Sequence, residues 1–531
     1  MDQHSGPIPA AFHSILTPGS TAPTPHLTLP QDEITRTLAQ ADRLLAADRW
    51  TDAANAYRIA LGIRTDLADA WFNLGYALRR SGHFEDAMAA YGEALAHGVR
   101  QPEVAHLNRA AILSDHLRRD ADAMVELQAA LAAAPGFRPA LLNLGNLHEE
   151  RGDRGAAVDC YHRLLGPHRV TADAMRCIAL ARLLQLQPPA SPDDALLTLA
   201  REAAADGSIP DRSALATLLF AIGRACDALG DTGAAFAAFS RGKAQAHAGA
   251  RGYDPARARR RTQALIAASP APAPGRPSAS QAPTPQPVFI CGMFRSGSTL
   301  LEQVLGGHPD VAIAGELDLL PRMASGVLAP FPATLATLDD VRCEALARDY
   351  HGNLLARLPA GSGHARYVTD KRPDNYLLIG LVKRLFPVAR IVHTVRHPVD
   401  NALSIFMQHL NPRVFDYAGS LGDIGHQYGE YRRLMAHWKQ IYPDDLFDFD
   451  YDAFVIDPEG TLRPLLEFLG LPWHAGCLAF HRLGNTVKTA SYWQVREPLH
   501  AGASGRWRRY GEHLGPLLQA LAAQGIAVDP D

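Results

Sequence analysis

Residues Pro287 to Leu305 read PVFICGMFRSGSTLLEQVL, and this stretch decides the fold of the C-terminal half of the chain. It opens with four apolar residues, Val288 to Cys291, which predict a buried strand. A turn of mostly small residues follows, Gly292 to Gly297, and Ser298 begins a segment with apolar residues at helical spacing. Such a turn gathers backbone N–H groups at the positive end of a helix dipole. The stretch therefore predicts an anion-binding loop in an α/β domain.

The loop differs from that of nucleoside triphosphatases at one position. Gly292 and Gly297 have the spacing of a Walker A loop, but Ser298 stands where that loop has the lysine that contacts the β- and γ-phosphates. Arg295 is the cation within the loop that would replace this lysine. We therefore expect a phosphate-binding loop without the NTPase lysine. An NTP-dependent kinase is the alternative that the glycine spacing alone would allow.

A second phosphate-binding segment follows a second predicted strand, residues 389–395. Arg396 comes at the carboxyl end of this strand, where open α/β sheets bind ligands, and Ser404 lies eight residues later. Together with the loop, this pair resembles the sulfotransferase family. There the loop binds the 5′-phosphosulfate of PAPS (3′-phosphoadenylyl sulfate), and an arginine and a serine spaced by eight bind the 3′-phosphate. The family's common loop, PRSGTTL, here reads FRSGSTL over residues 294–300.

The resemblance narrows to the tyrosylprotein sulfotransferases. In that branch a glutamate follows HPxV and a glycine, and residues 308–316 read HPDVAIAGE here. Glu316 is therefore the expected general base, because an acceptor hydroxyl must lose its proton as it attacks sulfur. Lys371 matches a family lysine that supports the sulfonate and its bridging oxygen, and Ser491 matches a serine that stabilises the transition state. Without the family, Glu316 would be interpreted as a solvated loop acid and Lys371 as a surface lysine.

The same resemblance implies the residues that bind the donor. Tyr451 matches a family nucleotide contact, with an interior packing tyrosine as the alternative, and Arg506 lies in a segment similar to the strip that closes over PAPS. The expected catalytic residues are Arg295, Glu316, Lys371 and Ser491. The expected donor-binding residues are Arg295, Ser296, Gly297, Ser298, Thr299, Arg396, Ser404, Tyr451 and Arg506. No metal is expected, because side-chain cations would neutralise the phosphosulfate.

The N-terminal half of the chain is repetitive. Residues 68–99 show the tetratricopeptide (TPR) pattern, and an Ala–aromatic–Ala signature recurs, more loosely in its later copies, at spacings of 34, 36 and 34 from Ala53, Ala87, Ala123 and Ala157. A degenerate copy contains Gly223 and Phe239. These repeats predict an α-solenoid, and the concave surface of such arrays binds peptides. We therefore expect the repeats to recruit a protein or peptide substrate, with anchoring of the enzyme as the alternative.

Seven prolines between Ser269 and Pro287 separate the two halves and predict an extended linker. The expected organisation is a flexible N-terminus over 1–30, a TPR region over 31–250, a helix end with a Pro-rich linker over 251–286, and a sulfotransferase domain over 287–531. The expected fold is thus a TPR α-solenoid followed by a P-loop-like three-layer α/β domain with a parallel central sheet.

Composition limits the partners and the location. The 531 residues carry a formal charge of only −3, so no nucleic-acid partner is expected. Six scattered cysteines lack a C-x2-C pair, so neither zinc nor a disulfide framework is indicated. The first residues lack the cationic start and apolar core of a signal peptide, and no run of about 18 apolar residues predicts a membrane span. A cytoplasmic location is expected, unlike the Golgi location of the secretory tyrosylprotein enzymes.

The expected function is transfer of a sulfuryl group from PAPS to an acceptor hydroxyl. Protein tyrosine is the first choice of acceptor, because a phenol loses its proton more readily than an alcohol. A carbohydrate, a lipid or a small phenol is the alternative acceptor. From another class of protein, the alternative is a TPR scaffold with a non-catalytic nucleotide-binding domain.

Overall fold

The computed structural model describes residues 29–166, 173–205, 209–269, 284–358, 364–483, 499, 502 and 504–528. The chain divides into two compact units between Leu186 and Gln187. The repeat region expected from the sequence runs on to residue 250, so its last helices belong to the same compact unit as the C-terminal sheet. The domain boundaries themselves stay a prediction.

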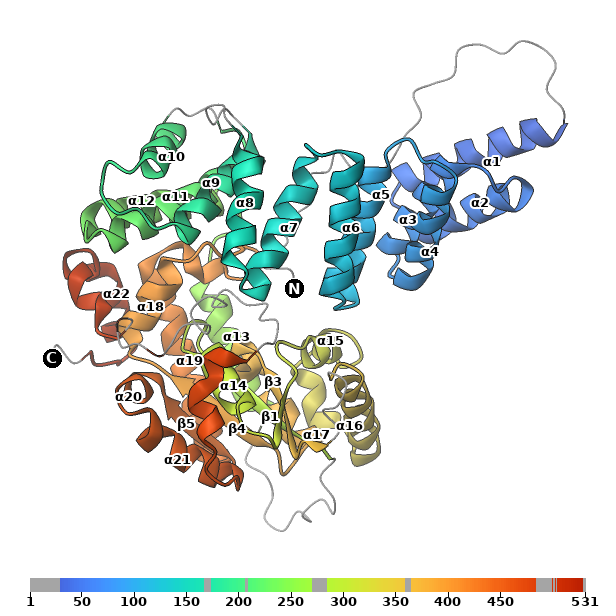
Figure 1. Cartoon of the computed structure of the whole chain (residues 1–531). Helices are drawn as coiled ribbons and strands as arrows, with labels where there is room; N and C mark the ends of the chain where they lie inside the picture. Colours follow the sequence, from blue (N-terminus) through green and yellow to red (C-terminus); the bar gives the residue numbers. More distant parts are fainter. Residues whose placement is uncertain are drawn as a thin grey trace. The chain divides into compact units, whose positions relative to one another are not determined.

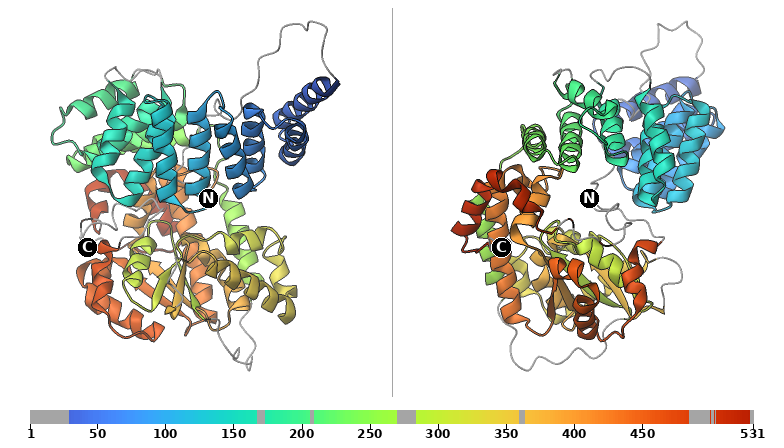
Figure 2. Two further views of the ribbon diagram at one scale, coloured as in Figure 1. Left: turned by 45° about the vertical axis from the view of Figure 1, so that its right-hand side comes forward. Right: turned by 60° about the vertical axis from the view of Figure 1, so that its left-hand side comes forward.

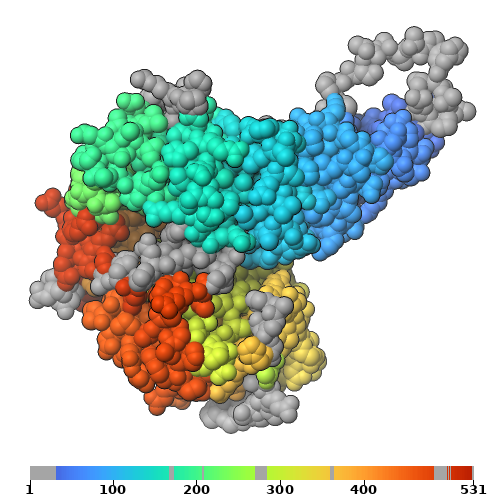
Figure 3. Space-filling model, in the orientation of Figure 1, coloured from blue at the N-terminus to red at the C-terminus, as the bar shows by residue number. Residues whose placement is uncertain are grey.

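The first unit is helical throughout its described residues (Figure 1). Its helices pack as successive pairs, α1 with α2, α3 with α4, α5 with α6 and α7 with α8. The surface of these pairs is continuous in Figure 3, in blue to teal. The helices are α1 (Leu29–Ala46), α2 (Trp50–Ile63), α3 (Ala68–Arg80), α4 (Phe84–Ala96), α5 (Pro102–Ala111), α6 (Asp120–Ala133), α7 (Arg138–Arg151), α8 (Arg154–Leu165) and α9 (Ala174–Leu186), with a π-helical turn η2 (Ile112–His116) after α5.

Two of these pairs close through the contact of a glycine with an aromatic ring. A Cβ atom at Gly75 of α3 would lie 2.9 Å from the ring of Tyr91 in α4, and one at Gly145 of α7 would lie 2.7 Å from the ring of Tyr161 in α8. Both rings are fully buried. A side chain at either glycine would push the helices apart, because a packed core has no room for it. This contact explains the small residue that the repeat pattern places there.

The second unit begins with four helices and continues with the sheet and the helices around it. The helices are α10 (Ala195–Ala205), α11 (Arg212–Ala228), α12 (Thr232–His247), α13 (Pro255–Ala267), α14 (Ser298–Gly306), α15 (Leu319–Ser325), α16 (Asp340–Leu355), α17 (Ile379–Leu385), α18 (Pro398–Phe406), α19 (Leu421–Ile441), α20 (Tyr451–Ile456), α21 (Pro458–Leu469) and α22 (Gly515–Ala523). Short helical turns are η3 (Ala333–Thr337), η5 (Pro373–Leu377), η6 (Asp416–Gly419), η7 (Ala475–Arg482) and η9 (Arg506–His513).

The hairpin of α11 and α12 combines repeat-like packing with contacts to the C-terminal domain. Gly223 lies against Phe239 as the repeat glycines lie against their rings, with a Cβ distance of 2.6 Å. On α12, the buried ammonium of Lys243 donates hydrogen bonds to the carbonyls of Ile405 and Gln408, at 3.2 and 2.9 Å. Ile405 lies in the last turn of α18 and Gln408 lies two residues after it, at the helix end where a cation is favoured. The hairpin therefore stabilises the C-terminal end of α18.

The sheet has five parallel strands in the order β2-β3-β1-β4-β5. They are β1 (Gln286–Gly292), β2 (Val311–Ile313), β3 (Tyr367–Lys371), β4 (Arg390–Val395) and β5 (Leu446–Asp450). Val288 and Ile290 of β1 pack against α14, α20 and α21, whereas Phe289 contacts Tyr350 of α16 and Phe386 on the opposite face. Helices therefore cover both faces, as Figure 2 shows, and the expected three-layer α/β domain with a parallel sheet is confirmed.

The register brings the predicted site segments to one edge of the sheet. Ile290 of β1 pairs with Lys371 of β3, and Gly292 pairs with Thr394 of β4. The carboxyl ends of β1, β3 and β4 therefore lie side by side, which is where ligands bind in open parallel sheets.

Among the helices that the structure describes, none is both long and apolar enough to cross a membrane.

The glycine–ring contact leads to a prediction about stability. We expect Gly145→Ala to lower the free energy of unfolding of the repeat unit by about 1–3 kcal/mol, the usual cost of overpacking. Gly62→Ala is the matched control, because Gly62 is an exposed residue of α2 with no atom within 4 Å of its Cβ position, and alanine is the better helix former. Urea unfolding followed by circular dichroism measures both. Equal stability of the two variants would contradict the contact.

Candidate functional site

The loop between β1 and α14 has the geometry expected of an anion-binding turn. Gly297 caps the N-terminus of α14 with φ of 99°, and a Cβ atom there would lie 2.5 Å from the ring of Tyr451. Arg295 also has a positive φ, 69°, which is uncommon for a residue with a side chain. The loop therefore bends sharply enough to bring the N-terminus of α14 to the carboxyl end of β1. Ser298 and Thr299 begin that helix and are buried.

The hydroxyl of Ser296 ties this loop to β4. It lies 2.6 Å from the hydroxyl of Thr394, which donates a hydrogen bond to the carbonyl of Cys291 at 3.1 Å. In the structure the side chain of Ser296 holds the loop through this contact with Thr394. Its expected role in binding the donor stays a prediction. The sequence analysis did not select Thr394, although its position two residues before Arg396 at a strand end could have suggested it.

Two arginines meet beside the loop. Arg396 donates from Nη1 to the backbone carbonyl of Arg295 at 3.2 Å, and Arg295 donates from Nε to the hydroxyl of Ser404 at 3.2 Å. The guanidinium of Arg396 lies over the ring of Tyr451, 4.9 Å from its centre. Burial, followed by the nearby charge of Arg396, lowers the pKa of Arg295 to about 10. Four of the expected donor-binding residues, Arg295, Arg396, Ser404 and Tyr451, thus lie together at one edge of the sheet.

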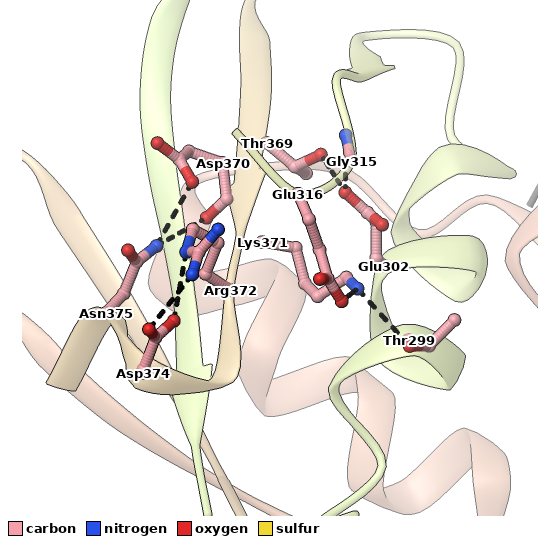
Figure 4. Close-up of polar contacts among 10 residues, drawn as sticks. All are labelled: Thr299, Glu302, Gly315, Glu316, Thr369, Asp370, Lys371, Arg372, Asp374 and Asn375. Carbon is pink, nitrogen blue, oxygen red and sulfur yellow. Dashed lines mark hydrogen bonds and ion pairs between the residues drawn. The ribbon is translucent and has the colours of Figure 1, made fainter. Parts of the chain in front are cut away.

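A second group joins Glu316 and Lys371, as Figure 4 shows. The ammonium of Lys371 lies 2.6 Å from Oε1 of Glu316 and 3.3 Å from the hydroxyl of Thr299. Lys371 is fully buried, whereas the side chain of Glu316 is 33 % exposed. The pair is therefore buried at the lysine and open to solvent at the carboxylate, so an acceptor arriving from solvent would reach the carboxylate first.

A buried glutamate that the sequence analysis did not select fixes the backbone before Glu316. Oε1 of Glu302 accepts hydrogen bonds from the backbone N–H of Gly315, at 3.1 Å, and from the hydroxyl of Thr369, at 2.8 Å (Figure 4). The carbonyl of Gly315 accepts from the backbone N–H of Lys371 at 3.0 Å. Burial raises the pKa of Glu302 to about 7. The sequence feature that could have identified Glu302 is a carboxylate within the apolar run of α14.

Arg506 lies near the same edge but is held by a different helix. Its guanidinium forms an ion pair with the carboxylate of Asp227 in α11, and its charge contributes to the lowered pKa of Arg295. The carboxylate of Asp400 accepts hydrogen bonds from the backbone N–H groups of Gly505 and Trp507, at 2.6 and 2.8 Å. Ser491 lies outside the described residues.

Comparison with known proteins agrees with this architecture. Residues 287–475 match the model of the sulfotransferase family, and residues 68–97 and 140–169 match models of the tetratricopeptide repeat. The chain therefore carries a sulfotransferase-family domain after tetratricopeptide repeats, as the sequence analysis predicted.

The similar proteins include protein-tyrosine sulfotransferases. The chain is 24 % identical over 257 residues to protein-tyrosine sulfotransferase 1 of Homo sapiens, covering 44 % of this chain and 66 % of that protein. It is 24 % identical over 241 residues to protein-tyrosine sulfotransferase 1 of Danio rerio, covering 41 % and 65 %. An uncharacterized protein of Aquifex aeolicus is 34 % identical over 253 residues, covering 45 % and 32 %. The chain thus spans less than two thirds of each of these relatives.

Two solved structures share limited similarity with the chain. The sulfotransferase domain of the Synechococcus PCC 7002 olefin synthase has 21 % identity and a TM-score of 0.33, covering 48 % of this chain and 99 % of that one. PilF of Pseudomonas aeruginosa has 18 % identity and a TM-score of 0.31, covering 40 % and 91 %.

The raised pKa of Glu302 leads to a prediction about pH. Because the folded protein binds this proton more tightly than the unfolded chain, the contribution of Glu302 to the stability of the wild type falls as pH rises from about 4.5 to about 7. In Glu302→Gln the amide oxygen accepts the same two hydrogen bonds and no proton is released. We therefore expect the variant to gain on the wild type by up to about 3 kcal/mol between pH 4.5 and 7.5 in urea unfolding.

The control for this experiment is Glu344→Gln, at an exposed carboxylate of α16. Asp370 has a pKa raised to about 6 by burial, but it is present in every protein compared, so its contribution cancels. A stability difference between wild type and Glu302→Gln that does not change with pH would contradict the buried, proton-binding state of Glu302.

Proposed function

We propose that this protein transfers a sulfuryl group from PAPS to an acceptor hydroxyl. The observation that carries the proposal is the convergence of Arg295, Arg396 and the glycine loop at the carboxyl edge of the sheet. The like charges of these two arginines repel each other, since Arg396 lowers the pKa of Arg295, so a bound anion would stabilise the arrangement. PAPS carries two anionic parts, a 5′-phosphosulfate and a 3′-phosphate, which suit the loop and the pair of Arg396 and Ser404.

The chemistry needs a base and a cation at the reacting atoms, and Glu316 and Lys371 lie side by side. In the proposed step, the acceptor oxygen forms a bond to sulfur while the bond from sulfur to the bridging phosphate oxygen breaks. The proton of the acceptor moves to the carboxylate of Glu316. The leaving group is adenosine 3′,5′-bisphosphate, and Lys371 would stabilise the charge that develops on the bridging oxygen. Ser491 retains its proposed role in the transition state.

The acceptor is proposed to be the phenol of a protein tyrosine. The similarity to protein-tyrosine sulfotransferases supports this choice, as does the lower pKa of a phenol compared with an alcohol. The repeats are proposed to bring the protein substrate to the enzyme, because TPR arrays bind peptides on their concave face. A cytoplasmic location is part of the same proposal.

Transfer of ³⁵S from labelled PAPS tests the function. We expect label in a tyrosine-containing peptide and not in the same peptide with phenylalanine. Label in a glycan, a lipid or a small phenol alone would replace the tyrosine proposal with that acceptor. If this chain binds a partner protein through its repeats but releases no adenosine 3′,5′-bisphosphate from PAPS, it is a scaffold with a non-catalytic domain. Tighter binding of ATP than of PAPS would contradict the donor.

Glu316→Gln separates catalysis from binding. The amide keeps the hydrogen bond from Lys371 but does not take a proton, so we expect turnover to fall by about 10² to 10⁴. Affinity for adenosine 3′,5′-bisphosphate, measured by calorimetry, should stay within about twofold of wild type, because the contact to the leaving group is unchanged. Glu344→Gln again serves as the exposed control. Normal turnover in Glu316→Gln would remove Glu316 as the base.

Arg396→Ala should weaken nucleotide binding, which Glu316→Gln should leave nearly unchanged. Loss of a charge-assisted contact to the 3′-phosphate should weaken binding of adenosine 3′,5′-bisphosphate by roughly tenfold or more. Adenosine 5′-monophosphate, which lacks the 3′-phosphate, should lose much less. Arg348→Ala, at an exposed arginine of α16, is the matched control. An equal loss for both nucleotides would place Arg396 at a phosphate other than the 3′ one.

A further inference from the structure

Helix α11 contacts the C-terminal domain along one stripe of its surface. Near its start, the hydroxyl of Thr217 lies 3.0 Å from Nδ1 of His409, and the ring of Phe220 stacks on the same histidine with centroids 5.4 Å apart. Near its end, Asp227 contacts Arg506. Residues spaced by three and four share a helix face. The stripe therefore runs from the segment just after α18 to the turn that contains Arg506, and α11 and α18 belong to the same compact unit.

Asp227 is the centre of a polar cluster at the end of this stripe. Its half-buried carboxylate accepts from the guanidinium of Arg506 and from the hydroxyl of Tyr510, the latter at 2.6 Å. Its backbone carbonyl accepts from Arg509 at 3.0 Å. Because Asp400 also holds the backbone on both sides of Arg506, that arginine is fixed both at its main chain and at its guanidinium.

Arg224 lies on the same stripe, four residues after Phe220 and three before Asp227. Its charge, like those of Arg396 and Arg506, acts on Arg295 and lowers the pKa of that residue. The helix register puts Arg224 on the stripe between Phe220 and Asp227, both of which contact the C-terminal domain, and the electrostatic effect on Arg295 agrees with this position. The repeat-like helix thus adds a cation to the site where the loop already gathers positive charge.

We propose that α11 forms part of the donor site: Arg224 binds a phosphate of the donor, and Asp227 positions Arg506 for the same anion. This inference rests on the proposed function. An arginine fork binds phosphate through two N–H groups, and a carboxylate on one side of the guanidinium leaves its other N–H groups available. Arg224 is a binding residue in this proposal, and Asp227 acts only through Arg506.

Calorimetry with adenosine 3′,5′-bisphosphate tests the role of Arg224 in the full chain. We expect Arg224→Ala to weaken binding by about tenfold, the loss of one charge-assisted contact. Arg212→Ala, at an exposed arginine at the start of the same helix, should change affinity by less than about twofold. Thermal unfolding without ligand shows whether each variant is folded. A folded Arg224→Ala protein that binds as tightly as wild type would overturn the proposal.

A double-mutant cycle tests Asp227. We expect Asp227→Ala to weaken binding by roughly fivefold in the wild-type background, and to have less than about twofold effect when Arg506 is already alanine. Thermal unfolding of each variant without ligand separates this coupling from a purely structural effect, because a structural role of the ion pair would lower the melting temperature in parallel with the affinity. Tighter binding by Asp227→Ala would show that the carboxylate competes with the donor for Arg506, and equal losses in both backgrounds would show that it acts independently of Arg506. Either result would overturn the positioning role.

Failure of the proposed function and failure of the role of α11 give different binding results. If the wild-type chain does not bind adenosine 3′,5′-bisphosphate, the proposed function is wrong. If the wild type binds it and Arg396→Ala weakens binding while Arg224→Ala does not, the proposed function stands and α11 is not part of the site.

Discussion

The like charges of Arg295 and Arg396, which meet where the guanidinium of Arg396 contacts the backbone carbonyl of Arg295, set the requirements for the structure around them. The register of β1 against β4 brings the two residues together, because Gly292 pairs with Thr394 and the arginines follow three and two residues later. The surrounding contacts then limit the repulsion. The ring of Tyr451 lies below one guanidinium, where its electron-rich face attracts a cation. That ring in turn occupies the space where any residue larger than Gly297 would place its Cβ. The loop, the ring and the glycine therefore depend on one another.

Most of this edge could be predicted from the sequence because its elements are local. The strand, turn and helix that begin at Pro287 are contiguous, and so are β4, Arg396 and Ser404. Glu316 and Lys371 were each selected, but their direct contact was not predicted. They are separated by 55 positions, and only the pairing of β2 with β3 brings them together. Periodicity predicts elements, whereas the order of strands decides which ends of elements meet.

The residues missed by the sequence analysis act on backbone groups or across long distances in the chain. Glu302 lies in a helix of apolar residues, and its partners Gly315 and Thr369 come from two other segments. Asp400 acts on N–H groups more than a hundred positions away. The α11–α12 hairpin was assigned to the repeats because Gly223 and Phe239 belong to a degenerate copy of the repeat signature, and the structure shows these two residues in contact. The residues on the outer side of the hairpin contact the C-terminal domain without any periodic sequence pattern. The sequence therefore could not predict that the hairpin belongs to the same compact unit as the sheet.

The hairpin of α11 and α12 is consequently under two independent constraints. One side must keep the fit of Gly223 to Phe239, and the other must keep the buried ammonium of Lys243 on the end of α18. A helix pair with both duties tolerates fewer substitutions than an ordinary repeat, whose outer side is free to vary. Gain or loss of whole repeats during evolution would then be confined to the pairs that precede it in the chain. Recombination that changes the number of repeats would then be expected to leave this last hairpin joined to the domain of the sheet.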